Sequence, residues 1–141
     1  MNLNIVSVSW DDAAAEHLKS VRFEVFVDEQ GVPPDIELDE LDHLSDHLLA
    51  RDSGGQALGC VRLTPAGQIG RMAVRAPFRN RGVGSQLLHA MIAQAKDQGR
   101  QAVFLHAQVH AQAFYQRHGF CPAGQTFCEA GIQHQHMTLS L

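Results

Sequence analysis

The feature that most constrains the fold is a strand, a tight loop and a helix that follow one another in the middle of the chain. An apolar run over residues 69–74 predicts a short strand, and Pro77 marks a turn after it. A helix is expected over about 82–98, because apolar side chains recur there at helical spacing: Val83, Leu87, Leu88, Met91, Ile92 and Ala95. The loop therefore lies at the positive end of a helix dipole.

The loop has the composition of an anion-binding site. Gly82 and Gly84 leave the backbone N–H groups at the start of the helix unobstructed. Arg79 and Arg81 add fixed positive charge that suits phosphate oxygens. A dinucleotide fingerprint would need a third glycine where Leu87 stands, and a P-loop would need a Gly-Lys-Ser/Thr string that the chain lacks. The sequence therefore predicts a site for a different phosphate-bearing ligand.

The spelling of the loop, Arg79-Asn-Arg-Gly82-Val-Gly84, resembles the pyrophosphate loop of the GNAT superfamily, the acetyl-CoA-dependent N-acetyltransferases. A second segment strengthens the resemblance. After an apolar run over residues 102–105, the superfamily pattern is Asn-x-x-Ala-x-x-Leu-Tyr-x-x-x-Gly-Phe. The positions in register with it are Ala111, Phe114, Tyr115, Gly119 and Phe120, while Gln108 stands where Asn is usual.

Two further segments resemble the ElaA/YjcF-type branch of this superfamily. Residues 25–30 read Val-Phe-Val-Asp-Glu-Gln, and residues 129–137 read Glu-Ala-Gly-Ile-Gln-His-Gln-His-Met. In the second segment Ala130 and Gln133 replace the Asp and Pro that the branch usually carries. The matching segments span nearly the whole chain, which predicts a single N-acetyltransferase domain over residues 1–141.

The resemblance implies a GNAT-like α/β fold of the mixed α+β kind. It has a mixed central sheet of about seven strands, helices on both faces, and a splayed pair of parallel strands that forms the acyl-CoA cleft. The hydrophobic pattern agrees with the order βαα-βββ-αβ-αββ. Strands are expected at 4–9, 47–52, 56–63, 69–74, 101–107, 121–128 and 135–139, and helices at 82–98, at 109–118 and after an N-terminal cap by Asp11 or Asp12.

The resemblance also implies a reaction in which an acetyl group passes from acetyl-CoA to a primary amine that attacks the thioester directly. The residues expected to bind the cofactor are Met72, Ala73, Val74, Arg79, Asn80, Arg81, Gly82, Val83, Gly84, Ser85, Gln108, Phe114 and Tyr115. Tyr115 would be the general acid that protonates the departing CoA thiolate. A non-catalytic acyl-CoA-binding or sensor domain is the alternative function.

The sequence does not single out the general base. Carboxylates and imidazoles border the expected acceptor side, and histidine has the ordinary pKa best suited to neutral pH. His47, Glu129 and His134 are selected as candidates for the base or the acceptor pocket. His134 and His136 would share one strand face, but no cysteine or acidic partner stands at ligand spacing, so no metal is expected.

The charges separate into two regions, although the net charge is only −4. Four arginines cluster near the loop: Arg71, Arg75, Arg79 and Arg81. Eight carboxylates stand between Asp28 and Asp46. We expect the first region to favour an anionic cofactor and the second to attract a cationic acceptor, with a solvated acidic loop as the alternative reading of the second.

Composition bounds the partners and the location. The acidic balance and the single Trp and single Tyr argue against nucleic-acid binding. There is no apolar run of about twenty residues and no signal-peptide pattern, so no membrane partner and a cytoplasmic location are expected. Cys60, Cys121 and Cys128 lack metal-site spacing and are expected to be buried or free thiols. Dimers are common among proteins of this kind, so a homodimer stays open.

Overall fold

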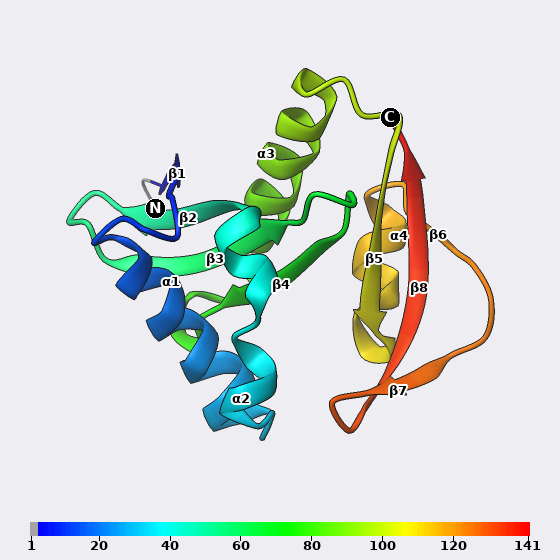
Figure 1. Cartoon of the computed structure of the whole chain (residues 1–141), viewed down its shortest axis with the longest axis horizontal. Coiled ribbons are helices and arrows are strands. Elements are labelled where there is room, and N and C mark those ends of the chain that lie inside the picture. Colours follow the sequence, from blue (N-terminus) through cyan, green and yellow to red (C-terminus); the bar gives the residue numbers. More distant parts are fainter. Residues whose placement is uncertain (1–2) are drawn as a thin grey trace.

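The computed structural model describes residues 3–141, and Figure 1 shows its strands and helices. The first half contains β1 (Leu3–Ser7), α1 (Ala15–Arg22), the π-helical continuation η1 (Phe23–Glu29), α2 (Pro34–Glu37), the 3-10 turn η2 (Glu40–Leu44), β2 (Asp46–Asp52) and β3 (Ala57–Leu63). The second half contains β4 (Ile69–Val74), η3 (Ala76–Phe78), α3 (Val83–Asp97), β5 (Ala102–Gln108), η4 (Val109–Ala111), α4 (Gln112–Arg117), β6 (Cys121–Pro122), β7 (Phe127–Glu129) and β8 (Ile132–Ser140).

The strands form two antiparallel groups that meet along one short line. The first group has the order β1-β2-β3-β4, and the second has the order β5-β8-β6 with β7 also paired to β8. The groups join where Gln68 and Phe104 form a parallel bridge, at which the Phe104 N–H donates to the Gly67 carbonyl over 3.1 Å. Beyond that bridge β4 and β5 separate, which confirms the predicted splayed parallel pair.

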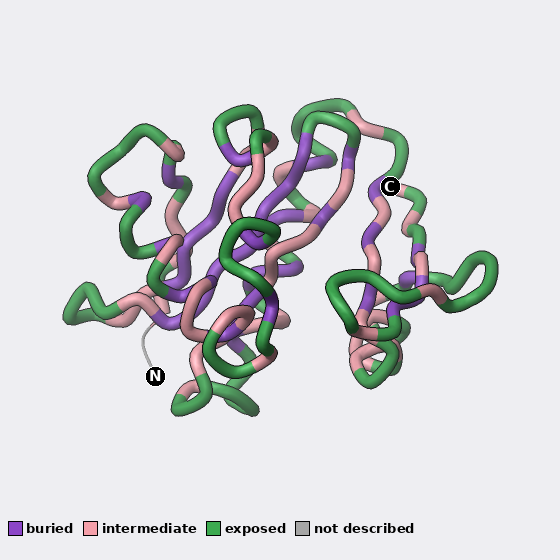
Figure 2. Tube along the Cα trace, turned by 60° about the horizontal axis from the view of Figure 1, so that its bottom comes forward, coloured by how far each residue is buried: buried purple, intermediate pink, exposed green. Residues whose placement is uncertain are grey.

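Helices cover both faces of the first group of strands, as expected. Neighbouring side chains on β2 point to opposite faces, so Leu48 packs in the cluster that includes Leu87 of α3, while Leu49 packs in the cluster that includes Leu18 of α1. The cluster beneath α3 is continuous with the apolar side of β5, where Leu105 is buried. Figure 2 shows the buried strands running between these exposed coverings.

The structure corrects two predicted details. The single strand expected over residues 121–128 is two short strands, so the described residues contain eight strands, β1–β8. The chain leaves the sheet between them because Gly124 takes a positive φ of 76° and the Gln135 side-chain amide holds the carbonyls of Ala123 and Gly124. Neither Asp11 nor Asp12 caps the first helix, whose N-cap is Ala14 without a side-chain hydrogen bond.

The helical segment that begins with α1 continues through η1 and ends beside the cleft. Leu18, Val21 and Val25 are buried along one side of it. The last turn of η1 therefore places Glu29 and Gln30 where they line the cleft between the two groups of strands.

Candidate active site

A β-bulge bends β4 where it begins to leave β5. Cys60 of β3 pairs with Ala73, but Arg62 pairs with Gly70, so Arg71 and Met72 together stand opposite Val61. Arg71 has a positive φ of 49°, a conformation that side chains other than glycine rarely adopt. Its guanidinium holds this geometry, since Nε donates to the Glu37 carbonyl over 3.1 Å and Nη2 donates to Asp39 over 3.3 Å.

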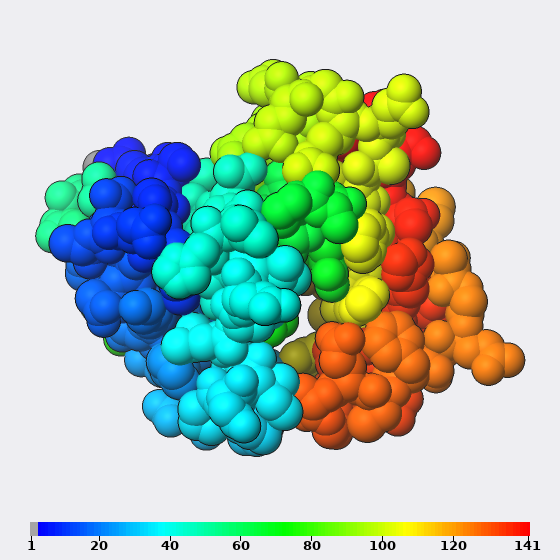
Figure 3. All heavy atoms as spheres, in the orientation of Figure 1, coloured from blue at the N-terminus to red at the C-terminus, as the bar shows by residue number. Residues whose placement is uncertain are grey.

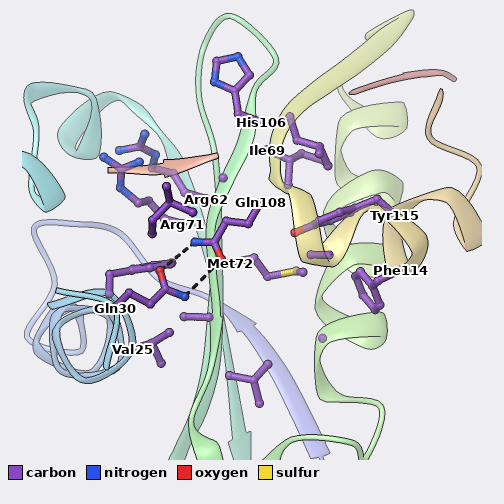
Figure 4. A pocket seen from close by; sticks show the side chains of 18 of the residues that line it. Val25, Gln30, Arg62, Ile69, Arg71, Met72, His106, Gln108, Phe114 and Tyr115 are labelled. Carbon is purple, nitrogen blue, oxygen red and sulfur yellow. Dashed lines mark hydrogen bonds between the residues drawn. The ribbon is translucent and has the colours of Figure 1, made fainter. Parts of the chain in front are cut away.

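The separated strands enclose one continuous cavity of about 1020 Å³. Figure 3 shows its mouth as a hollow between the segment near residues 30–40 and the segment near residues 125–131. Its floor is formed by β4 and the facing side of β5, and Figure 4 shows side chains from both strands directed into it. The cavity reaches from the beginning of α3 to the junction of β4 and β5, because both Gly84 and Gln68 line it.

The beginning of α3 has the predicted form of an anion site. The N-cap residue Gly82 has φ 81° and offers no side chain to cap the helix. The first hydrogen bond of the helix runs from the Gln86 N–H to the Gly82 carbonyl, so the preceding turn carries N–H groups that a helix leaves without internal partners. Gly82, Val83, Gly84 and Ser85 all line the cavity. A phosphate oxygen at this point would meet backbone donors at the positive end of a 15-residue helix.

The arginines do not gather at this site as predicted. Arg79 lines the cavity but forms an ion pair of 2.9 Å with Glu29. Arg75 pairs with Glu24 over 3.0 Å, and Arg71 contacts the Glu37–Asp39 segment at the other end of the cavity. Arg81 is exposed and does not line the cavity. The prediction that these four residues form one cluster was wrong, because the turn at Pro77 and the bulge send successive side chains in different directions.

Tyr115 stands on α4 and faces the cavity from the side of β5 (Figure 4). Its ring packs edge-on against Phe114 and Phe120, with centroid distances of 5.1 and 6.0 Å. No side chain among residues 3–141 hydrogen-bonds its hydroxyl, which leaves that group available to a ligand. Burial raises the pKa of Tyr115 to about 12, so the phenol keeps its proton at neutral pH. The hydroxyl is therefore a permanent hydrogen-bond donor in the cleft.

The other cofactor candidates also lie along the cavity. Met72, Ala73, Val74, Asn80, Gln108 and Phe114 line it. Gln108, at the end of β5, exchanges hydrogen bonds with Gln30 at the end of η1, and Figure 4 shows this pair crossing the cleft.

The base candidates are divided between two places. His47 is buried on β2, where its ring stacks on Trp10 and its Nε2 lies 2.8 Å from the Asp42 carbonyl. It does not line the cavity, so the structure removes it from the acceptor pocket. Burial lowers its pKa, with the charge of Arg22 adding to the effect. Glu129 and His134 do line the cavity, on the neighbouring strands β7 and β8.

The structure adds a residue that sequence analysis did not select. His106 of β5 lines the cavity, and its Nδ1 lies 3.2 Å from Glu129 Oε2. The signal was present in the strand itself, since His106 and Gln108 alternate with the buried Leu105 and Ala107. Two polar residues at a spacing of two in an otherwise apolar strand indicate a face that is turned to a site.

Three carboxylates of the acidic segment are paired with arginines that come from other elements. Glu37 and Asp42 are buried and share Arg22, with ion pairs of 2.8 Å each. Asp39 pairs with Arg62 over 2.8 Å and with Arg71 over 3.3 Å. The predicted acidic mouth is therefore an arginine–carboxylate cluster with three groups of each sign. Its carboxylates hold the loop in place, which the sequence spacing alone did not reveal.

Comparison with known proteins identifies the class. The chain belongs to the GNAT acetyltransferases: the family model described as an acetyltransferase (GNAT) domain matches residues 13–141. Within this family it is of the ElaA/YjcF type, as the sequence motifs predicted. It is 37% identical over 121 residues to the uncharacterized N-acetyltransferase YjcF of Bacillus subtilis, which covers 83% of this chain and 86% of YjcF.

Solved structures agree with this placement. An acyl-CoA N-acyltransferase from Pseudomonas aeruginosa superimposes with a TM-score of 0.86 at 32% identity, covering 97% of this chain and 99% of that one. Escherichia coli ElaA superimposes with a TM-score of 0.85 at 26% identity, covering 96% of this chain and 98% of that one. Within residues 3–141, no helix has the length and apolar character needed to span a membrane.

Proposed function

We propose that this chain transfers an acetyl group from acetyl-CoA to a primary amine. The observation that carries the proposal is the single cavity that joins an uncapped helix start, two separated strand edges and an unbonded tyrosine hydroxyl. The similarity of the chain to an acyl-CoA N-acyltransferase supports a CoA thioester as the acetyl donor. In this proposal the pyrophosphate binds at Gly82–Ser85, and the pantetheine arm lies along Met72, Ala73 and Val74.

The chemistry requires an electrophile, a nucleophile and a stabilised leaving group. A backbone N–H of the bulged β4 polarises the thioester carbonyl. The neutral amine attacks the carbonyl carbon, a C–N bond forms and the C–S bond breaks. The departing thiolate then lies near Tyr115 and takes a hydrogen bond or a proton from its hydroxyl. The tyrosinate is a stronger base than the CoA thiolate. Tyr115 therefore gives its proton to the sulfur only as the attacking nitrogen passes a proton back to Tyr115.

The acceptor half of the cavity does not favour a strongly cationic substrate. The carboxylates of Glu37 and Asp39 that line it are already paired with arginines. Its polar groups suit an uncharged or weakly charged amine that exchanges hydrogen bonds with the wall. In place of the cationic acceptor expected from the sequence, we therefore propose a primary amine and assign no charge to the rest of the acceptor molecule.

The test is an acceptor screen at saturating acetyl-CoA, with release of the CoA thiol as the readout. The panel contains neutral, cationic and anionic primary amines, and calorimetry on the same sample measures CoA binding. Acceptor-dependent thiol release supports the proposal. CoA binding without release by any amine would instead support a non-catalytic acyl-CoA-binding or sensor domain, the alternative function for this chain.

A further inference from the structure

We infer that His106 is the base that removes the proton from the acceptor ammonium, and that Glu129 positions it. The inference rests on the proposed function and deepens it, since it names the group that activates the acceptor. Neither residue role follows from the shared family, because the inference depends on where β5 and β7 bring these two side chains together in this chain.

His106 lies near the point where β4 and β5 begin to separate. The two groups of strands join at the Gln68–Phe104 bridge, and β4 and β5 separate from there toward Val74 and Gln108. A cofactor whose pyrophosphate binds at the start of α3 enters from the wide end, so its acyl group points toward the junction. His106 is two residues beyond Phe104, on the strand that borders the gap, and Figure 4 shows it next to Ile69 at that end.

A hydrogen bond to Glu129 indicates which ring nitrogen of His106 carries the proton. A carboxylate only accepts, so the ring nitrogen that faces it carries the proton. The Nδ1–H of His106 therefore donates to Glu129 Oε2 over 3.2 Å, and Nε2 is left with its lone pair. Gln68 Nε2 lies 3.4 Å from the same Nδ1, a longer contact than the one to Glu129. This arrangement fixes the tautomer and the ring orientation that a base requires.

Aromatic and titratable side chains surround His106. Phe127 of β7 packs edge-on against the ring at a centroid distance of 5.0 Å. The titratable groups in contact with it are Glu129 of β7 and His136 of β8, whose ring centroid is 5.5 Å away. The side chain of His106 is 26% exposed and that of Glu129 is 48% exposed. The ordinary pKa of an imidazole suits proton removal near neutral pH better than that of a carboxylate, which favours His106 as the base.

His134 is the rival base, and its place argues against it. It lies on β8 opposite Gln108, so the whole of β5 stands between it and β4. Its Nδ1 donates to the Ile132 carbonyl over 2.7 Å, its ring stacks on Phe127, and the residue is only 8% exposed. His106 is on the strand that borders the gap and meets the acceptor first.

Both protons that leave the acceptor nitrogen during acetyl transfer are accounted for. The acceptor ammonium loses one proton to His106 Nε2, and its lone pair then forms the C–N bond as the C–S bond breaks. The second proton leaves the nitrogen and ends on the CoA sulfur through Tyr115. His106 returns its proton to solvent after the products leave, so one proton is released for each acetyl group transferred.

The experiment compares four variants with the wild type: His106→Gln, Glu129→Gln, His134→Gln and His17→Gln. The last is a remote control at an exposed position of α1. We expect His106→Gln to lower kcat about a hundredfold or more, with the Kd for CoA unchanged. His17→Gln should stay within about threefold of the wild type, and His134→Gln should lower kcat far less than His106→Gln does. Glu129→Gln should move the acidic limb of the kcat/KM profile to lower pH, because the imidazolium loses its neighbouring negative charge.

A second measurement does not depend on turnover. The ¹⁵N NMR shifts of His106 in the free protein should report the Nδ1–H tautomer, and this preference should weaken in Glu129→Ala. An Nε2–H tautomer would overturn the inference, as would a His106→Gln variant that turns over like the wild type. If the wild type itself releases no thiol with any amine, the proposed function and the base role fail together. If the wild type turns over but depends on His134 instead, only the base role fails.

Discussion

Gln30 and Gln108 stand 78 positions apart in the sequence and exchange hydrogen bonds across the cleft, with N···O distances of 2.8 and 3.5 Å. Within residues 3–141 the backbone joins the two groups of strands near Gln68 and Phe104, and this amide pair adds a side-chain link away from that bridge. It lies at the opposite, wider end of the gap. The pair therefore ties the end of η1 to the end of β5 on that side of the cleft.

Removing this link should loosen the protein. Gln108→Ala deletes both hydrogen bonds, and we expect it to lower the free energy of unfolding by about 1–2 kcal/mol. Urea unfolding measures the change, and Gln116→Ala on the exposed side of α4 is the matched control. Equal midpoints for Gln108→Ala and the control would show that the pair does not hold the groups together.

The start of α3 can be tested with a side chain that the free protein tolerates. A Cβ at Gly84 would lie 3.7 Å from Phe114 and 3.8 Å from Val74, which are ordinary contacts. We expect Gly84→Val to fold and to weaken CoA binding about tenfold or more, equivalent to about 1.4 kcal/mol, because the side chain blocks the approach of the pyrophosphate. Gly84→Ala should show a smaller loss, and Gly54→Ala in the β2–β3 turn should show none. Calorimetry that returns wild-type affinity for folded Gly84→Val would contradict the placement.

Tyr115 separates catalysis from binding. Tyr115→Phe keeps the packed ring and removes only the hydroxyl, so we expect kcat to fall about a hundredfold while the Kd for CoA stays nearly unchanged. Since burial raises the pKa of Tyr115 to about 12, the wild-type rate should show no loss from its ionisation between neutral pH and about pH 10. Turnover of the variant within about threefold of the wild type would leave Tyr115 as a packing residue.

The arginine–carboxylate cluster should make stability depend on acid. Burial alone would raise the pKa of Asp42, but the hydrogen bond and charge of Arg22 hold it below its ordinary value of 3.8. A lowered pKa stabilises the fold at pH values above 3.8, and this contribution is lost as pH falls through the lower native value.

Asp42→Asn tests this linkage. At pH 7 it leaves Arg22, which is 1% exposed, without one of its ionic partners, and we expect a loss of about 3 kcal/mol. The difference from the wild type should shrink as the pH is lowered below about 4. Asp35→Asn, at an exposed position of α2, is the control. A stability difference that stays constant from pH 7 to acid unfolding would contradict the account.

Periodic patterns explain why so much of the fold was predictable. The apolar spacing from Val83 to Ala95 specifies a helix wherever the rest of the chain lies, and Gly82 and Gly84 predicted unobstructed backbone N–H groups at its start. The position of Tyr115 followed instead from the resemblance of its segment to the superfamily pattern.

The errors arose where contacts between distant segments decide the outcome. His47 stands near acidic residues in the sequence, but its strand turns it into the core against Trp10. Asp39 and Asp42 read as a charged surface until Arg22 and Arg62 reach them from other elements. His106 was missed because its meaning depends on Glu129, which follows 23 positions later on a different strand.

The central claim is that the cleft transfers an acetyl group to an amine, and a labelled donor tests it most directly. The protein is incubated with acetyl-CoA that carries a trideuterated acetyl group and with the best acceptor from the screen, and the amine is analysed by mass spectrometry. The account predicts a labelled N-acetyl product equal in amount to the thiol released, and almost none with Tyr115→Phe. Thiol release without labelled amine would reveal hydrolysis of the thioester and would contradict the account.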